Sequence, residues 1–159
     1  PLLLGDVDAG VIGACHAGWR GAATGIIQAT LAEMQAAGAQ QITALIGPTI
    51  RQASYQVGSE MRAEIMESQQ DSHVRADNIA GCFMADPEQD DRYLFDLPDF
   101  VRAQLEAAGV AQIADCGEDT YAPSRTESPR FFSHRRATHE AAPDSGRQIS
   151  IISLAATPG

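Results

Sequence analysis

The residues best suited to chemistry lie in the stretch Cys15–Gly21, which reads Cys-His-Ala-Gly-Trp-Arg-Gly. His16 can bind a metal ion or move a proton, and Arg20 can bind an anion. The two glycines allow a sharp turn, and the first N–H groups of a following helix are free to bind an anion. The stretch therefore predicts a strand-to-helix turn with His16 and Arg20 as candidate catalytic residues. The alternative is an ordinary strand-to-helix turn, in which the tryptophan packs against its neighbours and no residue takes part in chemistry.

A second group of polar residues lies nearer the C-terminus. Its members are Ser133, His134, Arg135 and Arg136, followed by Thr138, His139 and Arg147. Arginines beside hydroxyl groups suit a phosphate or the polar edge of a nucleoside. In an extended strand, neighbouring side chains face opposite ways, so only one of Arg135 and Arg136 would reach a given site. The alternative is that these arginines pair with surplus carboxylates on the surface.

His16 is also the best candidate for a metal ligand, although a lone histidine is often only a core or surface residue. Strand alternation puts His16 and Cys15 on opposite faces, so these neighbours should not share one metal ion. A catalytic zinc needs three protein ligands and an open fourth position. The 4 histidines form neither an H-x-x-x-H pair nor the signature of the zinc deaminases. Any partners of His16 must come from distant segments or from sequence before Pro1.

Composition and charge limit the classes of partner. The chain has 159 residues, of which 44% are hydrophobic and 20% charged, as expected for one globular domain over residues 1–159. It contains neither an apolar run long enough to cross a bilayer nor an export signal, so we expect a cytoplasmic protein without a membrane partner. The net charge of −10 argues against polymeric nucleic acid as a partner. All 11 basic residues are arginine, which excludes Schiff-base chemistry through lysine.

The three cysteines are Cys15, Cys82 and Cys116, an odd number without C-x-x-C spacing. We therefore expect free thiols rather than a disulfide framework. Cys82 or Cys116 could act as a nucleophile only if a base approached it, and a buried inert thiol is the alternative.

The elements that must position these residues follow from the hydrophobic pattern. Alternation predicts a hairpin of strands over 1–4 and 11–17, and further strands over 41–46, 54–57, 93–95, 112–115, 131–133 and 148–154. Helical periodicity predicts helices over 21–37, 59–68 and 96–109, the last with Asp96 as its N-cap. We expect mostly loops over 69–92 and 116–130, and a long connection over 137–146. Because no regular βαβ order appears, we predict an α+β fold of layered mixed sheets flanked by helices.

Together, the motifs resemble the polyphenol oxidase/laccase-domain family, which is also called the purine nucleoside phosphorylase-like YfiH family. The matching motifs, in the family's order, are His16–Gly21, Ile46–Pro48 with Ile50, Tyr55–Gly58, Phe95–Leu97, Phe131–Arg136 and Gly146–Gln148. The resemblance runs nearly from end to end. Two positions depart from it, because Thr49 stands where a cysteine is frequent and His134 where a tyrosine is common.

This resemblance implies a layered domain with one zinc ion bound by two histidines and one cysteine. Only His16 of these ligands maps onto this sequence, because the other two lie before Pro1 in the family. The chain therefore corresponds to the C-terminal part of a member and lacks its N-terminal region. The resemblance further implies phosphate-dependent cleavage of adenosine, inosine or guanosine to base and ribose 1-phosphate, with adenosine deaminase activity. In that reaction Arg20 and Ser133, with Arg135 or Arg136, would bind the phosphate.

We thus expect a small-molecule nucleoside and phosphate as partners, zinc as cofactor, and a monomer or weak homodimer. Three other functions stay open. Members of the family have also been described as copper-dependent polyphenol oxidases, although 4 scattered histidines cannot build several copper centres. A cysteine hydrolase acting on a cell-wall peptide precursor would use an upstream cysteine as nucleophile and His16 as base. A non-catalytic binding or structural domain is the third alternative.

Overall fold

The structure is a computed structural model that describes residues 1–70, 72–121 and 130–155. Its strands are β1 (Leu2–Asp6), β2 (Val11–Cys15), β3 (Thr43–Ile46), β4 (Gln56–Gly58), β5 (Phe83–Ala85), β6 (Arg92–Phe95) and β7 (Gln112–Asp115). Its helices are α1 (Trp19–Ala23), α2 (Ile26–Ala36), α3 (Ser59–Ser68), α4 (Ala76–Gly81), α5 (Leu97–Ala107) and α6 (His134–His139), with a 3-10 turn, η1 (Gln52–Ser54). The predicted α+β class is confirmed. Within the described ranges, no helix has the length and apolar character needed to cross a membrane.

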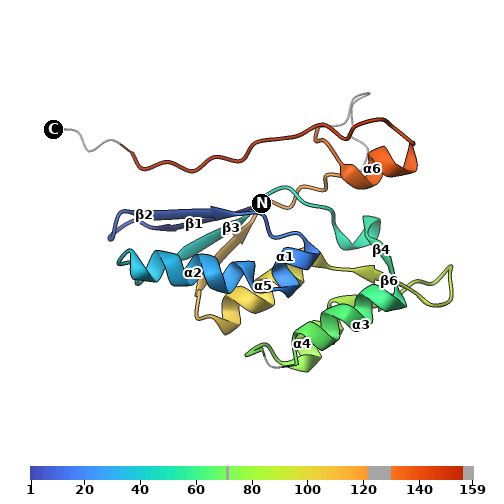
Figure 1. The fold of residues 1–159 in the computed structure, drawn as a ribbon, viewed down its shortest axis with the longest axis horizontal. Coiled ribbons are helices and arrows are strands. Elements are labelled where there is room, and N and C mark those ends of the chain that lie inside the picture. Colours follow the sequence, from blue (N-terminus) through green and yellow to red (C-terminus); the bar gives the residue numbers. More distant parts are fainter. Residues whose placement is uncertain (71, 122–129, 156–159) are drawn as a thin grey trace.

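The main sheet has four strands in the order β2-β1-β3-β7. β1 pairs antiparallel with both β2 and β3, and β3 pairs parallel with β7. Helices α2 and α5 cover one face of this sheet (Figure 1). Leu2 and Leu4 of β1 point into this layer and are almost fully buried. Each such side chain stabilises the fold by about 1.5–3 kcal/mol relative to an exposed one, so the main core lies between sheet and helices.

A smaller sheet has the order β4-β6-β5, and both of its strand pairs are antiparallel. Phe95 of β6 is fully buried, and its ring stacks on that of Phe83 at a centroid distance of 4.6 Å. The rings of Tyr55 and Phe100 each lie 5.7 Å from it. Because Phe100 belongs to α5, this aromatic cluster joins the smaller sheet to the main core.

The hairpin of β1 and β2 is held by a buried carboxylate at its turn. Asp6 is 3% exposed and accepts hydrogen bonds from the backbone N–H groups of Ala9 (3.0 Å), Gln40 (2.6 Å) and Gln41 (2.7 Å). These donors favour the ionised carboxylate and so lower the pKa of Asp6. One side chain therefore fixes both the turn and the chain that enters β3.

Helix α5 begins as the sequence predicts. The carboxylate of Asp96 accepts a hydrogen bond from the backbone N–H of Asp99 at 3.0 Å, and Pro98 lies in the first turn. Phe100, Val101 and Leu105 form its buried face. The hairpin, β7 and helix α3 also form where the sequence predicts them.

The helix predicted over 21–37 is confirmed only in part, because the chain forms two helices there, α1 and α2, and α2 covers most of the predicted range. Gly25 between them has a φ of 91°, a left-handed conformation that interrupts α-helical hydrogen bonding. The Thr24 hydroxyl donates to the carbonyl oxygen of Arg20 at 2.9 Å and closes the first helix. This break gives the residues after His16 a short helix of their own.

The chain between 69 and 92, predicted as mostly loops, contains α4 and β5. The predicted strand over 131–133 does not form, and helix α6 begins directly after Ser133. The predicted connection over 137–146 is confirmed only after His139, where α6 ends. The Ser133 hydroxyl accepts a hydrogen bond from the backbone N–H of Arg136 at 3.3 Å, as an N-cap residue does. Residues 122–129 of the predicted loop over 116–130 lie outside the described residues.

The predicted final strand over 148–154 does not form among the described residues. This segment runs extended along the face of the main sheet opposite α2 and α5 (Figure 1). Ile149 and Ile151 are 83% and 77% exposed, whereas Ile152 lies 3.8 Å from where a Cβ of Gly5 would stand. Alternating apolar residues make a strand only when a neighbouring strand supplies hydrogen bonds, and no described strand pairs with this segment.

Candidate functional site

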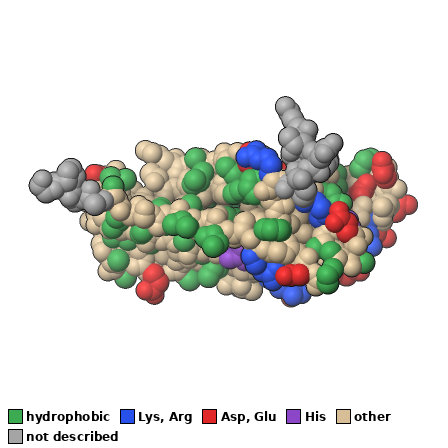
Figure 2. Space-filling model, turned by 90° about the horizontal axis from the view of Figure 1, so that it is seen from above, with side chains coloured by type: hydrophobic (Ala, Val, Ile, Leu, Met, Phe, Trp, Pro, Cys, Tyr) green, Lys and Arg blue, Asp and Glu red, His purple; other side chains and the backbone are tan. Residues whose placement is uncertain are grey.

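A cavity of about 960 Å³ lies where the end of β2, the loop after β3 and the C-terminal part of the chain meet. Its lining comes from residues within 1–3, 14–19, 48–55 and 132–150, together with Leu97 and Thr120. Viewed from the side of the C-terminal segment, the surface shows a histidine next to arginine side chains (Figure 2). The predicted turn at His16 and the polar group after Phe132 therefore contribute to one cavity.

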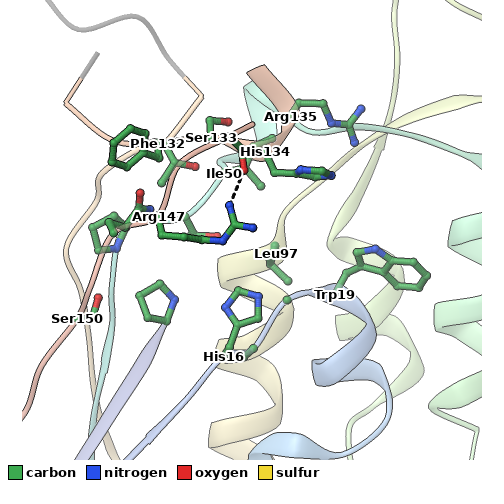
Figure 3. Close-up of a pocket in the computed structure, with 18 of the residues that line it drawn as sticks. His16, Trp19, Ile50, Leu97, Phe132, Ser133, His134, Arg135, Arg147 and Ser150 are labelled. Atoms are coloured by element: carbon green, nitrogen blue, oxygen red, sulfur yellow. Dashed lines mark hydrogen bonds between the residues drawn. The ribbon is translucent and has the colours of Figure 1, made fainter. Parts of the chain in front are cut away.

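His16 follows β2 and lines this cavity, with its ring among the side chains of the close-up (Figure 3). Two glycines make room for it. A Cβ at Gly18 would lie only 3.2 Å from the His16 Nε2, and a Cβ at Gly21 only 3.3 Å from the His16 carbonyl oxygen. The turn therefore places His16 because both positions lack a side chain. Cys15 is half-buried and packs against the core, whereas His16 is exposed, as strand alternation predicts.

Arg20, one of the candidate catalytic and phosphate-binding residues, is not among the residues that line this cavity. Its side chain is 76% exposed and lies 4.0 Å from a carboxylate oxygen of Glu64. Its guanidinium group also lies 4.8 Å from the centre of the Trp19 ring. Because α1 carries Arg20 away from the cavity and toward α3, the structure does not bring Arg20 together with His16.

The two adjacent arginines of α6 have different surroundings. Arg136 donates to the carbonyl oxygens of Thr120 (2.8 Å), Tyr121 (2.6 Å) and Phe131 (3.2 Å), and so holds together two parts of the chain. It does not line the main cavity, whereas Arg135 does. Only one of the two arginines lines the cavity, as the sequence predicts, although both lie in a helix and not in the extended strand that was expected.

Arg135 is held over an aromatic ring at the cavity wall. Its guanidinium carbon lies 5.1 Å from the centre of the ring of Tyr55, within the range of a cation–π contact. Burial raises the pKa of the Tyr55 phenol, and the charge of Arg135 partly opposes this rise. Ser133 also lines the cavity, but its hydroxyl accepts the capping hydrogen bond of α6. Ser133 therefore has a structural role, and its phosphate-binding role stays a prediction.

Arg147 belongs to the polar group near the C-terminus but is not among the residues predicted to bind the phosphate. It lines the cavity, and its guanidinium points toward His16 and His134 (Figure 3). The same group donates to the Ser145 hydroxyl at 2.9 Å, to the carbonyl oxygen of Gly146 at 2.6 Å and to a carboxylate oxygen of Asp144 at 3.4 Å, and its side chain is 80% exposed. Its presence in the Gly146–Gln148 motif was the signal that could have identified it.

All three cysteines are free thiols, as predicted. Burial raises the pKa of the Cys82 thiol to about 12, and this thiol donates to the carbonyl oxygen of Asn78 at 3.2 Å. A thiol of this kind is not ionised at neutral pH, so Cys82 fits the inert alternative. Cys116 is exposed and does not line the cavity.

The metal ligands predicted from the family resemblance are only partly present. Across residues 1–70, 72–121 and 130–155, no group of three His, Cys, Asp or Glu side chains could hold a metal ion. His134 and His139 line the same cavity as His16 without completing such a group. The described residues therefore do not fit a complete zinc site.

Fold and cavity together define an α+β protein with two sheets, and with a cavity built around a histidine at a strand-to-helix turn. Residues 1–155 match the model of the family described as multi-copper polyphenol oxidoreductase laccase, and the chain belongs to this family. The membership predicted from the motifs is thus confirmed.

Individual relatives agree with this assignment. The chain is 34% identical over 152 residues to a purine nucleoside phosphorylase of Rickettsia conorii, covering 96% of this chain and 58% of that protein. It is 36% identical over 138 residues to the adenosine deaminase RL5 of an unknown prokaryotic organism, covering 86% and 49%. The crystal structure of the hypothetical protein YfiH of Bacillus licheniformis superimposes with a TM-score of 0.69 at 27% identity, covering 86% and 49%. The chain thus spans about half the length of these proteins.

Proposed function

We propose that this chain forms part of the active site of a purine nucleoside phosphorylase. The observation that carries the proposal is the shared cavity, in which Arg147 and Arg135 join His16 in a protein of net charge −10. An acidic protein that gathers two guanidinium groups at a histidine is suited to a small anion. The name of the Rickettsia conorii relative supports phosphorolysis as the reaction.

In phosphorolysis, an oxygen of inorganic phosphate forms a bond to C1′ of the ribose while the bond from C1′ to the purine nitrogen breaks. The purine leaves with the electron pair and takes up a proton, and the products are the free base and ribose 1-phosphate. Positive charge gathers on the ribose in the transition state, so an anion held close to it lowers the barrier. In our proposal Arg147 holds that phosphate, with Arg135 at the cavity wall.

The departing purine needs a proton, and an imidazole is the side chain best suited to supply one near neutral pH. His16 lies in the cavity in a position fixed by Gly18. The family resemblance gives His16 a second role, as one of three zinc ligands. Because the described residues do not complete such a site, we assign no step to zinc. Metal analysis of the purified protein distinguishes these roles.

Two other activities remain candidates for the same cavity. The relative named adenosine deaminase supports deamination, in which water replaces the amino group of the purine. The family's description as a multi-copper oxidoreductase supports phenol oxidation, with copper as the alternative metal. Inosine formed from adenosine without phosphate would favour deamination. Stoichiometric copper and oxidation of a phenol would favour phenol oxidation.

The test is incubation of the protein with inosine or adenosine, with and without inorganic phosphate, followed by chromatography. The proposal expects hypoxanthine or adenine, together with ribose 1-phosphate, only when phosphate is present. Release of base that does not depend on phosphate, or no release of base at all, would reject it.

A further inference from the structure

Phe132 is a large aromatic side chain that has no role in the reaction proposed above. It directly precedes the cap of α6, is 55% exposed and lines the same cavity as His16. Its neighbour Phe131 is less exposed, lines only a smaller adjoining cavity and lies under the guanidinium of Arg130 at 5.4 Å. An exposed aromatic ring on the wall of a cavity is a feature of ligand sites rather than of a core.

Gly146 forms the support behind this ring. A Cβ at Gly146 would lie 2.3, 2.5 and 2.8 Å from three adjacent ring carbons of Phe132, closer than any side chain allows. Because these three carbons are nearly equidistant, the face of the ring rather than its edge rests on the glycine. The φ of 65° at Gly146 also disfavours any other residue. One face of the ring is therefore covered by backbone, and the rest of the ring lines the main cavity and the smaller adjoining one.

This arrangement lies beside the cation of the site. Gly146 directly precedes Arg147, and Phe132 appears next to the Arg147 segment and across the cavity from Trp19 (Figure 3). A flat aromatic surface next to an anion-binding group suits the two reactants of phosphorolysis, because the nucleoside carries a planar base and the phosphate is an anion. Stacking on an aromatic ring needs no particular hydrogen-bonding pattern, so it accepts different purines.

We propose that Phe132, supported by Gly146, is the surface on which the purine base of the nucleoside stacks. The choice of a purine as ligand rests on the proposed function. The arrangement itself requires only a planar aromatic ring, so free hypoxanthine and inosine are both suitable probes.

The experiment measures binding of inosine, of hypoxanthine and of inorganic phosphate to the wild-type protein and to four variants. We expect Phe132→Leu to weaken binding of inosine and hypoxanthine by roughly 5- to 100-fold, because stacking of a base on an aromatic ring strengthens binding by about this factor. Binding of phosphate should be unchanged. Phe132→Tyr keeps the ring and should bind like the wild type. Gly146→Ala keeps the Phe132 ring but puts a methyl group where that ring lies, so this variant should lose purine binding as well. Phe131→Leu is the matched control and should change neither.

Equal binding of inosine by Phe132→Leu and the wild type would overturn the inference. A parallel loss of phosphate and purine binding in Phe132→Leu, with a lower melting temperature, would also overturn it, because the role would then be structural. If the wild type binds inosine through Phe132 but yields no hypoxanthine with phosphate, the inference stands and the proposed phosphorolysis fails. If the wild type binds no purine in any form, both are rejected.

Discussion

His16 owes its position to a neighbour that has no side chain. A Cβ at Gly18 would approach the His16 Nε2 to 3.2 Å, so the ring or the turn would have to move by a few tenths of an ångström. We expect Gly18→Ala to lower the rate of phosphorolysis about tenfold, because small displacements of a reacting group are costly. The measurement is the rate with inosine and phosphate, together with the melting temperature.

Gly81→Ala is the matched control for this change. Nothing lies within 4 Å of a Cβ at Gly81, and this glycine ends helix α4 far from the cavity lining. Its rate should equal that of the wild type. A full wild-type rate for Gly18→Ala would show that the position of His16 does not limit the reaction.

A second single-residue effect concerns acid stability. The backbone donors at Asp6 lower its pKa in the folded state below the ordinary value of 3.8. A lowered carboxylate pKa stabilises the fold above the unfolded-state pKa, and this contribution is lost as the pH falls through the folded-state value. We therefore expect the urea midpoint to fall as the pH drops from 5 toward 2, and to fall less steeply in Asp6→Asn.

Asp8→Asn, at an exposed position of the same turn, should keep the wild-type pH dependence. The same slope for Asp6→Asn and the wild type would mean that other carboxylates control acid unfolding.

Among the elements, helix α5 connects the two sheets and starts at a well-defined cap. Removal of the Asp96 side chain leaves the N–H of Asp99 without its partner, so Asp96→Ala should lower the free energy of unfolding by about 1 kcal/mol. Burial raises the pKa of Asp96, which means that its charge is costly where it lies. Asp96→Asn keeps an acceptor without the charge and should be close to neutral. Chemical denaturation measures both, and equal losses would show that the cap hydrogen bond does not matter.

The elements also show how far the sequence predicts the fold. The β1–β2 hairpin and α5 form as predicted because local signals specify them, namely an alternating pattern around a turn and an N-cap with an early proline. The break at Gly25 was missed because the apolar stripe continues across it, and only its left-handed backbone reveals it. Helix α6 was missed because Phe131 and Phe132 read as the start of a strand. In both cases a local signal that the apolar pattern does not reveal decided the structure, namely a left-handed glycine and a serine N-cap.

The candidate site was predictable only in part for a related reason. A motif indicates which residues are chemically useful, but only the fold decides which of them meet. His16 and Arg135 line the cavity, whereas α1 directs Arg20 to Glu64 and Arg136 binds backbone carbonyls. Arg147 enters the cavity through an extended segment whose predicted strand does not form.

On the scale of the whole molecule, the two faces of the main sheet differ. Helices α2 and α5 bury one face, whereas the other lies beneath the extended C-terminal segment and keeps Ile12 and Leu45 36% and 39% exposed (Figure 1). The cavity lies at the end of this second face, where β2 delivers His16 and the C-terminal segment delivers Arg147. The site therefore depends on segments distant in sequence that meet at one edge of the fold.

In the proposed function this cavity binds phosphate for attack on a nucleoside, and Arg147 is the residue whose loss should affect that binding most. The measurement is the Michaelis constant for phosphate and for inosine in the wild type, in Arg147→Gln, and in Arg75→Gln. Arg75 is the matched control, because its side chain is as exposed as that of Arg147 and also lies beside a carboxylate, that of Asp77 at 3.9 Å, but it does not line the cavity. We predict that Arg147→Gln raises the constant for phosphate at least tenfold, as expected for loss of a charged hydrogen bond, and changes that for inosine little. An unchanged constant for phosphate in Arg147→Gln, with activity retained, would show that Arg147 does not bind the phosphate.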